Sequence, residues 1–190
     1  GTLSADAGIV FNGNLDGDVE TTARISHLFN ALPETIRNDL AFHDRWHAYL
    51  PGWELPKMQP DYFTYHMGFI ADYLAEIFHT ELRRRNYTDA YDRLFSLGNH
   101  VEERDRRAIA KTVSGLVKLI HPDGKCSEQE IQEYLTFAVE LRRRVKEQLK
   151  RMGGIEYAKV NLSYINKING QETFVPCKEL GSTQMIPDGS

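Results

Sequence analysis

The sequence predicts a mainly α-helical protein with a minor β part. Between residues 60 and 152, apolar side chains recur every three or four positions, the spacing that lines one side of a helix. A single apolar run near the start, residues 7–13, ends in polar amides and is typical of a buried strand. Near the other end, two short alternating segments flank Asn169-Gly170, a dipeptide that favours a tight hairpin turn.

The first third of the chain combines this strand with short helices. Residues 19–29 predict one helix. Residues 33–40 predict a second, with Pro33 at its first position, where the missing N–H does no harm. A core strand needs neighbours in a sheet. Because partners for residues 7–13 are not evident nearby, we expect this chain to be a piece of a longer protein.

A second short strand is predicted just before residue 51. Trp46, Ala48 and Leu50 occupy alternate positions, with His47 and Tyr49 between them. This period of two is the strand pattern. Pro51-Gly52 follows and ends the predicted strand.

The middle of the chain predicts a helical bundle. Its first member carries a wide apolar face formed by Phe69, Ile70, Tyr73, Leu74, Ile77, Phe78 and Leu82. Residues 88–95 predict a short helix with Thr88 as its N-cap. Residues 102–120 predict a longer one, which ends at the run His-Pro-Asp-Gly that follows it.

The last bundle helix has clear signals at both ends. Ser127 and Glu130 have the spacing of a capping box, in which each side chain accepts the other's backbone N–H. Apolar residues then recur to Met152, and Gly153-Gly154 ends the helix. Beyond it, the sequence predicts the small hairpin around Asn169-Gly170 and a loose tail rich in Gly, Ser and Pro.

Composition narrows the class of protein. The chain has 190 residues, 41% hydrophobic and 26% charged, enough for one domain with a real core or two small ones. Its net charge of −4 argues against a general polyanion binder. Two distant cysteines do not form a disulfide framework, and no run approaches eighteen apolar residues. We therefore expect a cytoplasmic protein with no membrane partner.

Two familiar kinds of site are not expected. His43 and His47 are four residues apart, but in the predicted strand they would lie about 13 Å apart, too far for one metal ion. Gly124-Lys125 is followed by Cys126 where a phosphate-binding loop needs Ser or Thr, and its first glycine would fall on Leu119. The sequence thus predicts no metal site and contains no P-loop.

Polar side chains at three places are candidates for a functional site. Asn12 and Asn14 either form a turn or project from the carboxyl end of a strand into a ligand crevice. Asp44-Arg45 is either a surface ion pair or a fixed arginine that contacts phosphate. Arginines 104, 106 and 107 either form a solvated helix face or include one that reaches a nucleotide.

Two further arginine runs have a less specific interpretation. Residues 83–85 and 142–144 are each Arg-Arg-Arg. They would suit a nucleic-acid-binding helical module, but acidic residues are interspersed with them. An ordinary solvated helix face is therefore favoured for both.

The order of these features resembles the second half of an AAA+ ATPase module. The string AFHDRWHAYLPGWELPKM resembles the segment of Lon-type ATPases in which a helix, Asp-Arg and a strand lead into a helical lid. Together with IVFNGNLD, KTVSGLVKLIHPDG and RRRVKEQLKRMGGIEY, it makes the chain similar to the Lon-like AAA+ ATPases of bacterial BREX phage-defence systems, the BrxL family. The resemblance spans roughly residues 7–160.

The resemblance implies a role for each candidate. Asn14 would be the sensor-1 amide, with Asn12 as the alternative. Arg45 would be the arginine finger that acts on the ATP of a neighbouring subunit. Arg107 would be the sensor-2 arginine of the lid, with Arg106 and Arg104 as rivals.

The resemblance also implies an organisation. Residues 1–56 would be the end of the AAA+ α/β core, 57–153 the helical lid, and 154–190 a hairpin connector to a Lon-like domain. The longer protein would use ATP and Mg²⁺ in a homo-oligomeric ring, with DNA as a further partner. The Walker motifs would precede residue 1, so these 190 residues alone are expected to bind ATP poorly and not to hydrolyse it. The alternative is a non-enzymatic helical module that binds protein or nucleic acid.

Overall fold

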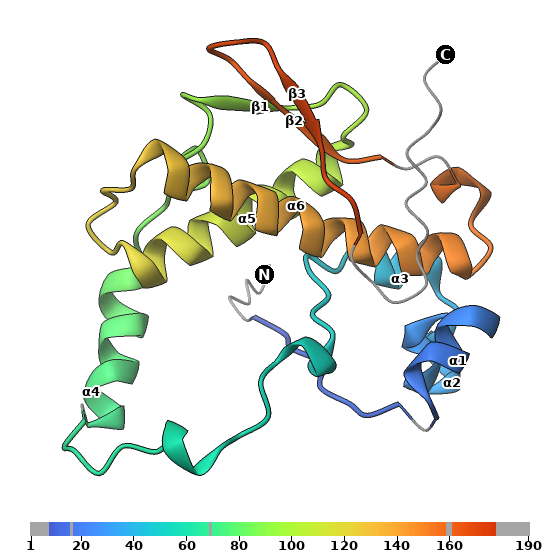
Figure 1. Ribbon diagram of the computed structural model, residues 1–190, viewed down its shortest axis with the longest axis horizontal. Helices are drawn as coiled ribbons and strands as arrows, with labels where there is room; N and C mark the ends of the chain where they lie inside the picture. Colours follow the sequence, from blue (N-terminus) through green and yellow to red (C-terminus); the bar gives the residue numbers. More distant parts are fainter. Residues whose placement is uncertain (1–7, 16, 69, 159–160, 178–190) are drawn as a thin grey trace, which may run out of the picture.

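Two long antiparallel helices form the centre of the protein. The computed structural model describes residues 8–15, 17–68, 70–158 and 161–177. Helices α5 (Glu103–Ile120) and α6 (Glu128–Arg151) lie along each other, and a small sheet covers one side of them (Figure 1). The prediction of a mainly α protein with a minor β part is confirmed.

The two long helices were predicted correctly because their local signals are strong. Ile109, Val113 and Val117 form a buried stripe along α5, and Leu135 faces it from α6. The capping box at the start of α6 is present, with the Ser127 N–H donating to Glu130 Oε2 over 2.8 Å. Gly153, at φ 89°, follows the end of the helix, as predicted.

The sheet has three antiparallel strands in the order β1-β2-β3. Strands β2 (Ser163–Asn166) and β3 (Glu172–Phe174) form the predicted hairpin, and Gly170 takes φ 71° in its turn. Strand β1 (Phe95–Leu97) pairs with β2 and was not predicted.

The prediction of a helix over residues 88–95 is wrong. Residues 88–94 form turns, and Phe95 begins β1. Tyr91, Leu94 and Phe95 are all buried in the same core as α5 and α6, and the Phe95 ring packs edge-on against Tyr164 of β2 at 5.5 Å. Burial of these three side chains in the core therefore outweighs the local preference of residues 88–95 for a helix.

Short helical elements near the start of the chain pack against the C-terminal half of α6 (Figure 1). The helix predicted over residues 19–29 is divided, because the backbone at Ser26 is extended. Pro33 is the N-cap of its helix rather than its first residue. The elements are α1 (Val19–Ile25), the 3-10 helix η1 (Leu28–Ala31), α2 (Glu34–Arg37) and α3 (Leu40–His43).

Neither early strand prediction is confirmed. Residues 8–15 are extended but unpaired, with Ile9 77% and Val10 89% exposed; residue 7 lies outside the described residues. A strand without a neighbouring strand has no ladder to join. Residues 46–50 also form no strand, because they lie against a helix, where the Tyr49 N–H points to the Leu141 carbonyl at 3.4 Å.

The segment between residues 52 and 82 begins beside α6, where Arg144 pairs with Glu54, and then projects away from the rest of the protein (Figure 1). It contains the 3-10 helices η2 (Gly52–Glu54) and η3 (Pro60–Tyr62), helix α4 (Ala71–Glu76) and the π-helix η4 (Ile77–Leu82). The predicted helix is therefore present from residue 71, while Phe69 lies outside the described residues. Its apolar face is uncovered, with Ile70 74% and Tyr73 58% exposed.

A last 3-10 helix, η5 (Ile155–Tyr157), follows α6 and packs against it. Within the described ranges, no helix is both long enough and apolar enough to cross a membrane.

Candidate functional site

Four charged side chains form a cluster inside the protein, between α3, α5 and α6. We call Asp44, Asp105, Arg142 and Lys146 the buried ion cluster. Arg142 donates to Asp44 over 2.8 Å and to Asp105 over 2.7 Å. The Lys146 ammonium lies 3.0 Å from one carboxylate and 3.3 Å from the other. The four side chains are at most 5% exposed, so their charges are tolerated only because each is paired.

Other groups surround the cluster and complete it. Arg104, at the start of α5, pairs with the second oxygen of Asp44 and remains 48% exposed. Glu102, which precedes α5, lies 3.3 Å from the Lys146 ammonium, and the Trp46 carbonyl accepts a hydrogen bond from Arg142. Both oxygens of Asp44 are therefore bound by cations.

The charge of Asp44 is favoured by these contacts. Burial alone would raise the pKa of its carboxyl group, but Lys146 and the neighbouring guanidinium groups outweigh burial and hold the pKa below its ordinary value. Asp44 is thus ionised in the folded protein at neutral pH.

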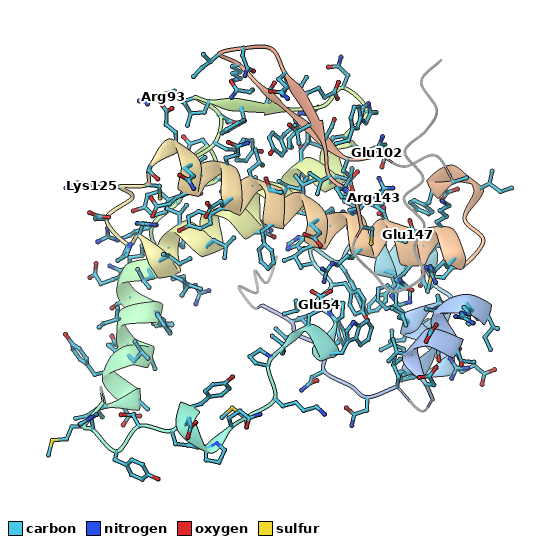
Figure 2. The ribbon with its side chains drawn as sticks, viewed as in Figure 1. Glu54, Arg93, Glu102, Lys125, Arg143 and Glu147 are labelled. Atoms are coloured by element: carbon cyan, nitrogen blue, oxygen red, sulfur yellow. The ribbon has the colours of Figure 1, made fainter. Side chains whose placement is uncertain are left out.

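Helix α6 supplies most of the polar contacts to the first third of the chain. Arg144 lies 2.9 Å from Glu54, and Gln148 accepts the Leu28 N–H over 2.7 Å. Arg151 donates to the Ala23 carbonyl. Figure 2 shows Glu54 on η2, beneath α6, and Arg143 and Glu147 along α6 itself. The C-terminal half of α6 therefore anchors residues 23–54.

The prediction of a solvated face at residues 142–144 is wrong. These three arginines are 0%, 7% and 2% exposed. Each has a partner: Arg142 in the buried ion cluster, Arg143 on Asn161 at 3.1 Å, and Arg144 on Glu54. A run of three arginines cannot reveal this by itself, because the two carboxylates that bind Arg142 lie 37 and 98 residues away in sequence.

Arg45, the candidate arginine finger, lies on the surface beside this cluster. The side chain of Asp44 points inward to α5 and α6, whereas Arg45 is exposed and donates to the Ala41 carbonyl. The Arg45 N–H donates to the Phe42 carbonyl over 3.2 Å, so the backbone forms a turn after α3. Asp44-Arg45 is therefore not a surface ion pair, because Asp44 is buried with other partners.

Asn12 and Asn14 are exposed and lie on the extended segment at residues 8–15. That segment is placed by Phe11, whose ring stacks on Trp46 at 5.2 Å with a 14° angle between planes. Phe11 also meets the edge of Phe42 at 5.9 Å. The two asparagines are thus on a segment that packs beside the turn of Arg45.

The three arginines that begin α5 differ in their surroundings. Arg106 donates to the Gly98 and Val101 carbonyls over 3.1 and 3.0 Å, which fixes the loop before the helix. Arg104 binds Asp44. Arg107 pairs with Glu103 at 2.9 Å, with both side chains about 70% exposed. Because exposed pairs are weak, the guanidinium group of Arg107 is the one most readily available to a ligand.

The structure brings the candidate segments together, but not the candidate side chains. Phe11 and Trp46 join the asparagine segment to the Arg45 turn, and Asp44 and Arg104 join that turn to α5. Among the contacts of the described residues, none directly links Asn14, Arg45 and Arg107.

Buried histidines near the Arg45 turn are packing groups. His43 is fully buried, lies 5.0 Å from the Phe29 ring, and its Nε2 contacts the Arg37 carbonyl at 3.0 Å. Burial lowers the pKa of His27 and of His43, which favours the neutral form of both imidazoles. Within the described ranges, no group of three or more His, Cys, Asp or Glu residues is placed to hold a metal ion.

A serine, a histidine and a glutamate also meet beside the sheet, and sequence analysis missed them. The Ser163 hydroxyl donates to Glu172 over 2.5 Å and lies 3.3 Å from His100 Nε2. Ser163 is completely buried, and in the described contacts Glu172 binds the serine rather than orienting the histidine. Gly98 is needed here, because a Cβ at that position would lie 2.1 Å from the hydroxyl. These three side chains therefore link β2 to β3 and to the loop after β1, and they do not form a nucleophilic site.

Comparison with known proteins gives the class and then the family. A family model described as "Lon-like protease BrxL-like, ATPase domain" matches residues 1–163, which makes the chain part of a Lon-like ATPase domain. The chain is 48% identical over 188 residues to the Lon-like protease BrxL of Escherichia coli O9:H4 (strain HS). It is 49% identical over 186 residues to that of Bacillus cereus (strain H3081.97). The chain belongs to the BrxL family.

The matches also show how much of a relative the chain represents. They cover 99% and 98% of this chain, but only 27% of each relative. The chain thus spans about a quarter of the length of the curated relatives that it matches.

Proposed function

We propose that this chain is the nucleotide-responsive second half of a Lon-like AAA+ ATPase. Residues 1–56 would be the end of the α/β core, residues 57–153 the lid, and residues 154–190 a connector to a further domain. The observation that carries the proposal is the Asp44–Arg104 ion pair, together with the BrxL ATPase-domain match. That pair joins the turn of Arg45 to the helix of Arg107, the two elements that must act on ATP.

In this proposal the candidate residues divide the work of hydrolysis. Negative charge accumulates on the γ-phosphate oxygens in the transition state, and fixed guanidinium groups stabilise it. Arg45 faces outward and would reach the ATP of the neighbouring subunit. Arg107 would reach the ATP of its own subunit after releasing Glu103, and Asn14, with Asn12 as the alternative, would orient the attacking water.

The remaining requirements would be met by other parts of the longer protein. Mg²⁺ and the triphosphate need a phosphate-binding loop, and we expect a G-x-x-x-x-G-K-[ST] segment within about 150 residues before Gly1. Because Arg45 would act in trans, the active form would be a homo-oligomeric ring. We further propose, from the family resemblance, that the ring engages DNA in phage defence in the cytoplasm.

The experiment is the substitution Arg45→Ala in the full-length protein. Loss of an arginine finger lowers kcat about 10³-fold or more, whereas folding and ATP binding should persist. Arg24→Ala is the matched control, because Arg24 is an exposed arginine that pairs only locally with Glu20. ATP hydrolysis, nucleotide affinity and thermal unfolding would be measured for each. Hydrolysis that survives in Arg45→Ala would reduce Arg45 to a structural residue.

The alternative, a non-enzymatic nucleic-acid-binding module, has lost one of its two candidate surfaces. It required the arginines at residues 142–144, which are buried and paired. At the other run, Arg85 donates to the Pro122 carbonyl over 2.5 Å. If the full-length protein binds DNA through phosphate contacts, its affinity for DNA should fall steeply as the salt concentration rises.

A further inference from the structure

We infer that Asp44 is a positioning residue that fixes Arg45 relative to the lid, so that the lid of one subunit controls the arginine offered to its neighbour. The inference rests on the proposed function, because it assigns a task to Asp44 only if Arg45 acts on ATP. It goes beyond that function by coupling the proposed nucleotide contact of the lid to the arginine proposed to act on the next subunit.

The first support is that two adjacent residues point in different directions, Asp44 into the protein and Arg45 toward solvent. Asp44 and Arg45 share one turn after α3, with the Asp44 N–H bonded to the Leu40 carbonyl at 2.9 Å. The Asp44 side chain is 5% exposed and Arg45 is exposed. A buried, fully paired side chain restricts the backbone of the residue that follows it. The contacts of Asp44 therefore fix the backbone position from which the Arg45 side chain projects.

The second support is the origin of those contacts. Oδ1 of Asp44 is held by Arg142 and Lys146 of α6, and Oδ2 by Arg104 of α5. All three cations belong to the region proposed as the lid. The turn of Arg45 is thus attached to the lid by three charged contacts through a single carboxylate.

The third support is the place of Arg104 on its helix. Arg104 and Arg107 are three residues apart on α5, so they are neighbours on the helix surface. A displacement of α5 toward a nucleotide would move both. Because an unpaired buried carboxylate is strongly unfavourable, the Arg45 turn would move with the lid rather than leave Asp44 behind.

The buried ion cluster contains a matched control for this inference. Asp105 has the same buried partners as Asp44, Arg142 at 2.7 Å and Lys146 at 3.3 Å, and its side chain is 2% exposed. It differs in that it belongs to α5 and is not joined to Arg45. Asp44→Asn and Asp105→Asn remove the same charge from the same cluster, and only the first touches the turn of Arg45.

The test measures the two variants in the full-length protein, alone and in mixed rings. Both should lower the midpoint of thermal unfolding. Asp44→Asn alone should lower kcat for ATP hydrolysis at least tenfold, with KM for ATP within about twofold of wild type. Equal kcat values for the two variants would overturn the inference.

Rings assembled from two kinds of subunit distinguish a misplaced Arg45 from a general structural defect of the Asp44→Asn subunit. Asp44→Asn subunits would be mixed with subunits whose own P-loop lysine is replaced but whose Arg45 is intact. The second kind cannot hydrolyse ATP, yet it can offer Arg45 to its neighbour, so hydrolysis by the Asp44→Asn subunits should recover. A purely structural defect stays in its own subunit and does not recover.

Arg45→Ala subunits in the same mixture are the reference. If Arg45→Ala recovers and Asp44→Asn does not, this inference fails while the proposed function stands. If Arg45→Ala does not recover, the trans action of Arg45 fails and the inference fails with it.

Should Asp44→Asn not fold, Arg104→Gln replaces it, because it removes the half-exposed partner of Asp44 and leaves the buried contacts. Recovery of Arg104→Gln supports the inference, and absence of recovery overturns it.

Discussion

At the scale of residues, the main feature is a set of charges buried with their partners. Arg142 contacts two carboxylates and the Trp46 carbonyl while its own side chain is 0% exposed. Pairing and hydrogen bonds of this kind are what offset the cost of burying a guanidinium group. The cluster therefore fixes one arrangement of three chain segments and tolerates few others.

Replacement of Arg142 should destabilise the protein strongly. Arg142→Met would leave Asp105 with only the ammonium of Lys146, which Asp44 shares, while Asp44 keeps Arg104 as well. Breaking a buried pair in this way destabilises by about 3–5 kcal/mol. Urea unfolding of the variant would measure the loss. Arg107→Ala is the control, because it removes only a surface pair and should leave stability nearly unchanged. Equal effects of the two variants would contradict the buried ion cluster.

Stability should also decline on the acid side of neutrality. Burial lowers the pKa of His43 below its ordinary value of 6.5, so the unfolded chain takes up a proton that the folded chain resists. This contribution is complete above pH 6.5 and is lost as the pH falls through that value toward the folded pKa. His27 behaves alike. A second loss follows below about pH 4, where Asp44 becomes protonated in the unfolded chain and then in the folded one.

The histidine contribution can be isolated by substitution. Urea midpoints measured from pH 8 to pH 5 should fall less steeply for His43→Asn than for wild type, although the variant is less stable overall. His66→Asn, at an exposed position, should leave the slope unchanged. An unchanged slope in His43→Asn would show that His43 does not take part in this pH dependence.

At the scale of elements, helix α6 has two halves with different kinds of burial. Its first half buries apolar side chains such as Ile131 and Leu135 against α5 and the sheet. Its second half buries Lys146 and Gln148 against the short helices of the first third. The same helix thus joins the apolar core of the bundle to the segment that carries Arg45.

Replacement of two glycines by alanine should change the stability of the protein in opposite directions. Gly170 takes φ 71° in the hairpin turn with open space around its Cα, so Gly170→Ala should cost about 1–2 kcal/mol through backbone strain alone. Gly115 lies within α5, also with open space, so Gly115→Ala should stabilise by up to about 1 kcal/mol. Thermal unfolding of the two variants checks this, and shifts in the same direction would contradict the turn geometry.

At the scale of the whole molecule, the described chain has two unequal parts. One is a well-packed unit of α5, α6 and the sheet, with the first third attached to α6. The other is the projecting segment of η3, α4 and η4, with exposed aromatic and aliphatic side chains such as Tyr65 and Met67. The chain covers 27% of the length of its relatives.

The whole-molecule prediction concerns activity. The purified 190-residue chain should show no ATP turnover, because the proposed phosphate-binding loop is not among its residues. The full-length protein, assayed in parallel with Mg²⁺ and ATP, should hydrolyse it. Turnover by the 190 residues alone, with contaminating ATPases excluded by Arg45→Ala in the same chain, would contradict the proposal.

The sequence by itself determined the features that depend on neighbouring residues. The capping box of Ser127 and Glu130, the apolar stripe of α5 and the hairpin at Asn169-Gly170 are local signals, and each was predicted. The family was also recognisable from the sequence, because the resemblance was based on strings such as AFHDRWHAYLPGWELPKM, and the family model confirms it.

Only the tertiary structure decided the environment of the charged residues. Asp44 and Arg142 are 98 residues apart, and no local pattern reveals that the two form a buried ion pair. For the same reason the early strand predictions are not confirmed: strand formation needs a partner strand, and residues 8–15 and 46–50 meet aromatic rings and a helix instead. Whether a charge is solvated or buried depends on what the folded chain places beside it, which is a property of distant residues and not of the local sequence.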